Sequence, residues 1–317
     1  MAQPEWKSWL TAPQRAVFLQ SLQAVFDARG LQVSISSDAL VMGDIAVDLL
    51  TLAQRCAQAE VADYPQVIEA NIDDLLLSCR DTIASTVLDQ DWEQARAWVK
   101  LRLLPLEQIS GSEDELISAP IGADLAIVLV YDLPDSVVSV LPEAAAGWPV
   151  NGAELWPITL DNLRDEDPPP EVERIVLAEG VDAFLVSGES LFITSRLLLL
   201  GDILPPERFP QGALVIVPHR HVMVLHPILD QGVYDAMAGL SLMGQEMFAS
   251  GPGPLSPAVY WWQGNAIERI EITVDVEADE VTLSPSEALD AMLEALPPLG
   301  SEEAPTPPER RDGVHIK

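Results

Sequence analysis

The spacing of hydrophobic residues predicts helices and short strands in the first part of the chain. Thr11–Gln14 has the pattern of a capping box with proline in the first turn, and Gly30 stands where a left-handed helix end is favoured. A second cap with proline opens a long amphipathic stretch at Asp63. Short apolar runs between the two helices predict strands, so residues 1–92 are expected to form an α+β lobe. The apolar face of the first helix is expected to contain Val17, Phe18, Leu22, Val25 and Phe26.

From Trp98 onward the pattern favours strands. "WVKLRLLPL" predicts one strand, and "DLAIVLVYDLPDSVVSVLP" predicts a hairpin with its bend at Asp132–Asp135. In "ERIEITVDVE", Ile270 and Ile272 alternate with charged or polar residues, which is typical of an antiparallel sheet with one face in water. Residues 93–300 are therefore expected to form a second, β-rich α+β lobe, followed by a disordered tail at 301–317.

The clearest break in the pattern is "RDEDPPPEVE" at 164–173, which we expect to be an extended and exposed connector. The fold class predicted for the whole chain is α+β with two lobes. In each lobe, antiparallel sheets are expected to pack against helices.

Charge narrows the possible partners, because 50 acidic residues outweigh 17 basic ones and give a formal net charge of −33. A body this negative repels a nucleic-acid backbone and an anionic membrane surface, so neither is expected as a partner. The acids increase solubility in any case, and they would also attract a cationic protein partner.

We expect a cytoplasmic bacterial protein. The first residues, "MAQPEWKSWLTAPQ", lack the basic and apolar regions of a signal peptide. The longest apolar run, Leu125–Tyr131, is too short for a membrane span. Arginine greatly outnumbers lysine and alanine is abundant, which favours the coding bias of a GC-rich bacterium.

Three of the four histidines, His219, His221 and His226, lie in "ALVIVPHRHVMVLHP". Residues two apart share one face of a strand, so His226 would point away from the other two, and no metal site is expected. The apolar runs on either side of Pro218–His221 instead predict a hairpin with these residues at an exposed bend. No cofactor is expected.

A candidate nucleophile, Ser190, lies between a predicted strand, "VDAFLVS", and a predicted helix, "ESLFITSRLLLL". This is the context of a nucleophile elbow, but Phe192 stands where the second glycine of G-x-S-x-G belongs. Ser187 or Ser190 could instead cap the helix. A triad of Ser190, a histidine and an acid stays open, because its members need only meet in space.

Trp261 and Trp262 are a candidate binding element. Adjacent residues of a strand point to opposite faces, so one indole is expected in the core and the other could anchor a neighbouring lobe or a partner. Together with a methionine-bearing helix they would form an exposed apolar patch. The methionines concerned are Met237, Met243 and Met247.

Four segments, in their order along the chain, resemble the YtpQ-like family of bacterial proteins of unknown function. The similarity covers roughly Trp98–Ile272, and Pro157 and the acidic connector depart from the family pattern. The resemblance implies a cytoplasmic α+β protein and supplies no catalytic residue. The segments are "LAIVLVYDLPDSVVSVLPE", "ELWPITLDNLR", "ITSRLLLL" and "GALVIVPHRHVMVLHPI". Their most specific points are Asp132-Leu133 with Ser136, Asn162-Leu163-Arg164, Thr194-Ser195-Arg196 and Val217-Pro218-His219.

The resemblance directs attention to Arg196. If Arg196 approaches the His219–His221 bend, these side chains would form a small positive island that holds an anionic group of a ligand or partner. The alternative is that Arg196 pairs with a nearby acid.

Two classes of function follow. The preferred one is a non-enzymatic protein-interaction module with a strongly acidic surface, because no complete catalytic motif is present. The alternative is a hydrolase that uses Ser190 with His219 or His221. The candidate ligand-binding or partner-binding residues are Arg196, His219, Arg220, His221, Trp261 and Trp262.

Overall fold

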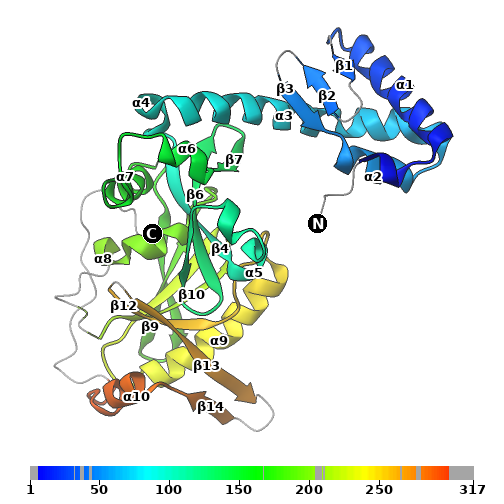
Figure 1. Cartoon of the computed structure of the whole chain (residues 1–317). Coiled ribbons are helices and arrows are strands. Elements are labelled where there is room, and N and C mark those ends of the chain that lie inside the picture. Colours follow the sequence, from blue (N-terminus) through cyan, green and yellow to red (C-terminus); the bar gives the residue numbers. More distant parts are fainter. Residues whose placement is uncertain are drawn as a thin grey trace. The chain divides into compact units, whose positions relative to one another are not determined.

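The computed structural model has an α+β fold with antiparallel sheets, as the helical and strand patterns of the sequence predicted (Figure 1). The structure describes residues 6–31, 33–35, 39–42, 45–166, 168–203, 209, 211–264, 266–275 and 280–299. The chain divides into two compact units, Met1–Asp91 with Leu133–Val138, and Trp92–Asp132 with Ser139–Lys317. The tail predicted at 301–317 lies outside the described residues.

The first unit is built on helices whose ends the sequence marks. The Gln14 side-chain oxygen accepts hydrogen bonds from the Thr11 amide and hydroxyl at 2.9 and 2.7 Å, and Gly30 adopts a φ of +71° at the other end of the helix. This confirms the first predicted helix, whose apolar face is buried in a core shared with α2 and α3. The helices are η1 (Trp6–Trp9), α1 (Ala12–Ala28), α2 (Leu50–Ala57), η2 (Val61–Asp63) and α3 (Tyr64–Gln90).

A small antiparallel sheet packs with these helices. Its order is β1-β2-β3, with bounds Ser34–Ile35, Ala39–Met42 and Ile45–Asp48. Residues Leu133–Val138 belong to the same unit, where Arg80 of α3 forms an ion pair with Asp135.

The second unit contains two larger sheets. The smaller of them has the order β4-β6-β5 and also includes the short β7, and helix α7 packs beside β4. Helix α7 continues through Pro157, and its start is capped by the Asn151 side chain, which accepts hydrogen bonds from the amides of Ala153 and Glu154 at 2.9 and 3.2 Å. The strands are β4 (Val99–Pro105), β5 (Ser118–Ile121), β6 (Leu125–Leu133) and β7 (Ser136–Ser139). The helices are α4 (Trp92–Ala95), α5 (Leu106–Ile109), η3 (Glu113–Glu115), α6 (Pro142–Ala146) and α7 (Gly152–Arg164).

The seven-stranded sheet has the order β14-β13-β12-β10-β11-β9-β8. Helices α9 (Val233–Ser250) and α10 (Glu287–Glu294) share a core with one of its faces (Figure 1). The predicted alternation is confirmed in β13, where Ile270 is buried and Glu271 is exposed. The strands are β8 (Glu171–Ala178), β9 (Val181–Ser187), β10 (Ala213–His219), β11 (Val222–Pro227), β12 (Val259–Gln263), β13 (Ala266–Asp275) and β14 (Glu280–Ser284).

The segment after β9 differs from the predicted continuous helix. Leu191–Ile193 form turns, and a 3-10 helix, η4 (Thr194–Leu199), leads into the short α8 (Leu200–Ile203). Most residues of η4 are buried, and Arg196 is one of them. Within the described part of the chain, no helix has the length and apolar character needed to cross a membrane.

Candidate functional site

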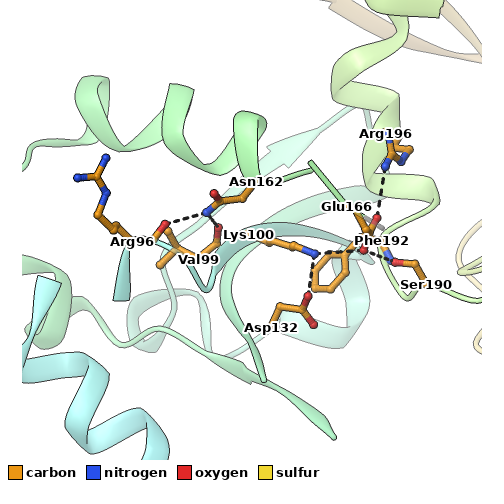
Figure 2. Close-up of polar contacts among 9 residues, drawn as sticks. All are labelled: Arg96, Val99, Lys100, Asp132, Asn162, Glu166, Ser190, Phe192 and Arg196. Carbon is orange, nitrogen blue, oxygen red and sulfur yellow. Dashed lines mark hydrogen bonds and ion pairs between the residues drawn. The ribbon is translucent and has the colours of Figure 1, made fainter. Parts of the chain in front are cut away.

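Strand β4 carries a lysine into the interior of the second unit. Lys100 is only 7 % exposed, although it lies in a mainly apolar strand. Its ammonium nitrogen lies 2.7 Å from a carboxylate oxygen of Asp132 and 3.1 Å from one of Glu166 (Figure 2). It also lies 4.7 Å from the ring centroid of Phe192, within the range of a cation–π contact. Buried charges are found where they are paired in this way.

Glu166 is the centre of this buried charge cluster, and the sequence interpretation missed it. It belongs to the connector at 164–173, yet its side chain is only 10 % exposed. One carboxylate oxygen accepts hydrogen bonds from Lys100 and from the Ser190 hydroxyl, the latter at 2.5 Å. The prediction of a wholly exposed connector is therefore wrong at Glu166, because two buried cations require a carboxylate there.

Arg196, which lies in η4, is the fourth member of the charge cluster. Its guanidinium lies 3.6 Å from the second carboxylate oxygen of Glu166, and the residue is 9 % exposed. Burial lowers the pKa of Arg196, and the charge of Glu166 opposes that effect. Arg196 is thus paired with an acid, and the expectation that its charge contributes to a positive island is wrong. Two cations and two anions balance inside the cluster, whose members are Lys100, Asp132, Glu166 and Arg196.

Two side chains beside the cluster bind the outer edge of β4. The Asn162 amide donates to the carbonyl oxygens of Arg96 and Val99 at 2.9 and 2.8 Å (Figure 2). The Ser195 hydroxyl accepts a hydrogen bond from the Leu103 amide at 3.0 Å. These bonds satisfy backbone groups that an edge strand leaves unpaired. Asn162, Ser195 and the charge cluster together fasten α7, the connector and η4 to the smaller sheet.

The Ser190 side chain is held by a carboxylate and a backbone amide and not by a described histidine ring. Its hydroxyl donates to Glu166, accepts the Phe192 amide at 3.0 Å, and has no hydrogen bond to a histidine ring among the described residues. A serine hydroxyl has a single proton to donate. His221 instead lies 3.2 Å from the backbone oxygen of Ser190, so the hydrolase hypothesis gains no geometric support. The prediction that Ser187 or Ser190 caps the following helix is wrong, because the N-cap of η4 is Ile193 and the amide that donates to Ser190 belongs to the preceding turn.

The histidine-bearing bend forms as predicted between β10 and β11, but it is not exposed. His219, Arg220 and His221 are half-buried because the loop after α9 packs against them. The Arg220 amide donates to the Gly253 carbonyl at 3.1 Å. A Cβ atom on Gly251 would lie 2.1 Å from the His219 ring, so only glycine allows this approach.

His226 lies apart from the bend in a different environment. It is 7 % exposed within β11, and its Nδ1 atom lies 2.6 Å from the Asp182 carbonyl oxygen. Burial lowers the pKa of His226, which favours the neutral ring. Across the described residues, no group of three or more histidine, cysteine or acidic side chains is placed to hold a metal ion.

The tryptophan pair does not form an exposed patch. Trp261 is 3 % exposed and Trp262 is 4 % exposed, so the prediction that one of them anchors a partner is wrong. Trp261 packs in the core with α9 and donates its indole N–H to the Gln211 carbonyl at 2.9 Å. Both faces of β12 are covered, which leaves neither indole available. Met237 is also fully buried.

A second polar cluster lies beside a cavity of about 500 Å³ and was also missed. Asp124 accepts hydrogen bonds from the hydroxyls of Tyr260 and Ser256 at 2.6 and 2.9 Å, and from Arg269 at 3.1 Å. Burial and the bond to Asp124 raise the pKa of Tyr260, which keeps the phenol protonated. Asp124 is already paired with Arg269, so the cluster joins the loop before β6 to β12 and β13 without a free charge.

Most of the described basic side chains are neutralised by carboxylates of the same chain. Nine of the described basic side chains form ion pairs with carboxylates of the same chain, most of them at the surface. These ion pairs neutralise positive charges that would otherwise be available to a partner at the protein surface. These basic residues are Arg29, Arg55, Arg80, Arg96, Lys100, Arg164, Arg174, Arg196 and Arg269.

Comparison with known proteins does not identify a relative. No family model matches the chain, and neither a curated protein nor a solved structure does. The resemblance to the YtpQ-like family therefore stays a prediction. Inference about function has to start from the geometry and charge of the chain itself.

Proposed function

We propose that this protein is a non-catalytic interaction module of the bacterial cytoplasm that binds a basic segment of a protein partner through its acidic surface. The supporting observation is the neutralisation of nine described basic side chains by carboxylates of the same chain. Because most of the described basic side chains are paired within the chain, the charges available to a partner are mainly those of carboxylates. Such a surface attracts cationic segments over about a Debye length, roughly 8–10 Å at physiological salt.

Strand β8 is the part of the surface that suits such a segment best. It is an end strand of the seven-stranded sheet, and no described strand pairs with its outer side. Glu171 and Glu173 are exposed there and form no ion pair with a described residue, and Val176 is 71 % exposed. An extended segment could add to this edge through backbone hydrogen bonds and place lysine or arginine near the two glutamates. The same glutamates would disfavour pairing between two copies of the chain.

The test uses a synthetic peptide in which lysine alternates with valine, labelled for fluorescence anisotropy. We expect the intact chain to bind it and to lose affinity as sodium chloride is raised. Exposed charge pairs contribute about 0.2–1 kcal/mol each, so Glu171→Gln combined with Glu173→Gln should weaken binding by about two- to thirtyfold.

A matched control removes the same amount of charge elsewhere. Glu115 and Glu246 are exposed and lie outside β8, so Glu115→Gln combined with Glu246→Gln should leave the affinity within about twofold. Equal weakening by both double variants would show that only the overall charge matters and would remove β8 from the proposal. Absence of salt-sensitive binding to the intact chain would refute the proposed function.

A further inference from the structure

Among the described arginines, Arg15 of α1 and two arginines of the second unit form no ion pair with a described carboxylate. Arg102 on β4 and Arg220 in the bend between β10 and β11 form no ion pair with a carboxylate among the described residues. Both side chains are half-buried. In a chain with 50 acidic residues, a partly buried cation without an acid beside it is unexpected.

The fold brings these two arginines toward the same place. Alternation along β4 puts Arg102 on the face of Lys100, and Lys100 lies over Phe192 of the turn after β9. Ser190 of that turn is in contact with His221 of the bend, 3.2 Å from its backbone oxygen to the imidazole Nδ1. Strand β4 therefore contacts the turn after β9, and this turn contacts the bend.

The hydrogen bonds of the bend leave donors free. Arg220 Nε donates to His221 Nε2 at 3.0 Å, which requires the neutral His221 ring to carry its proton on Nδ1 and donate it to the Ser190 carbonyl. The two terminal nitrogens of Arg220 have no hydrogen-bond partner among the described residues, and the same holds for the guanidinium of Arg102. His219 accepts the His221 amide on Nδ1 at 3.4 Å, so its Nε2 is left as a donor.

The two cations influence each other unfavourably. Burial lowers the pKa of Arg102, and the positive charge of Arg220 lowers it further, so the two guanidinium groups repel each other. Burial and the charges of the bend likewise lower the pKa of His219. An anion placed between the arginines would remove the repulsion and satisfy their free N–H groups.

We propose that Arg102 and Arg220, with His219 beside them, bind the phosphate group of a small phosphorylated molecule. Two guanidinium charges match a dianionic phosphate monoester, whereas one carboxylate would leave a positive charge uncompensated. Planar guanidinium groups suit bidentate bonds to phosphate oxygens. A polyanion such as nucleic acid is disfavoured because the rest of the body carries a formal charge of −33. The site is independent of the acidic edge proposed for partner binding.

The test measures the midpoint of thermal unfolding and the dissociation constant by calorimetry, with inorganic phosphate and with glycerol 3-phosphate. Sodium chloride at equal ionic strength serves as the reference. We expect both phosphates to raise the unfolding midpoint of the intact chain. Arg102→Gln and Arg220→Gln should each weaken binding at least tenfold. Tighter binding of the monoester would indicate a phosphorylated metabolite, and equal binding would indicate free phosphate.

Arg174→Gln is the matched control, because Arg174 is exposed and already ion-paired with Asp182. It should bind phosphate like the intact chain. A second readout follows the His219 ring signals by NMR, where phosphate should raise the pKa of His219 by compensating the charge of Arg220. The proposal is overturned if phosphate acts no differently from chloride, or if Arg174→Gln weakens binding as much as Arg102→Gln and Arg220→Gln.

Discussion

Replacing Glu166 by glutamine removes one charge from the buried cluster and keeps the shape of the side chain. Lys100 then keeps Asp132 at 2.7 Å, but Arg196 loses its only ion-pair partner among the described residues. Arg196 is 9 % exposed, so water cannot replace the lost carboxylate. Breaking a buried ion pair from one side costs about 3–5 kcal/mol. We expect the lower end, about 3 kcal/mol, because the amide can still accept the hydroxyl of Ser190.

The assay is urea unfolding, followed both by tryptophan fluorescence and by far-ultraviolet circular dichroism. The two signals have to coincide before a single free energy of unfolding is extracted, because the chain has two units. A second variant isolates the cause of the loss. Arg196→Met in the Glu166→Gln background removes the unpaired cation, and the double variant should recover about 1–3 kcal/mol relative to the sum of the single changes.

Asp165→Asn is the matched control, since Asp165 precedes Glu166 in the connector and is exposed. Its free energy of unfolding should change by no more than about 0.5 kcal/mol. If Glu166→Gln costs no more than Asp165→Asn, the carboxylate of Glu166 does not stabilise the buried cations, and the cluster described here has no energetic role.

Three further predictions concern single side chains. Ser195→Ala leaves the buried amide of Leu103 without a partner, so the urea assay should show a loss of about 1–3 kcal/mol, and no loss would contradict the edge cap. Burial lowers the pKa of His226, so its contribution to stability should be complete above its unfolded pKa of about 6.5 and should decline as the pH falls below that value. His226→Asn should flatten the pH dependence of stability between about pH 7.5 and 5, and an unchanged slope would assign it to other groups. A fluorophosphonate probe should label the intact chain no faster than Ser190→Ala, because no described histidine ring contacts the Ser190 hydroxyl; labelling abolished by Ser190→Ala would revive the hydrolase hypothesis.

Sequence patterns predicted the elements that are defined by local rules. The capping box at Thr11 and the left-handed Gly30 limit α1, and the alternation around Ile270 defines an antiparallel strand. Two apolar runs flanking Pro218–His221 predicted the hairpin. Each of these signals depends on neighbours a few residues apart along the chain, so no knowledge of distant contacts is needed.

The charge cluster depends on contacts between distant segments, which a single sequence does not specify. Glu166 stands among acids and prolines that are typical of an exposed connector, and its neighbour Asp165 is indeed exposed. One signal was available in "WVKLRLLPL", where the apolar surroundings of Lys100 imply a buried cation and therefore a buried acid elsewhere. That signal shows the need for an acid but does not say which of the 50 acidic residues meets it.

The tryptophan pair illustrates a different difficulty. Alternation correctly separates Trp261 and Trp262 onto two faces of β12, but it cannot say whether the second face is covered. That depends on the packing of elements far along the chain, and here both faces are buried.

The edge of β4 has a consequence for the order of events during synthesis. Its partners are the side chains of Asn162 and Ser195, which follow β4, β5 and β6 in the chain. While the ribosome is still translating toward Ser195, the emerging four-stranded sheet has bare amides and carbonyls along β4. A nascent chain stalled or truncated in this interval would therefore be prone to pair with another strand, and chaperones would be needed most at this stage.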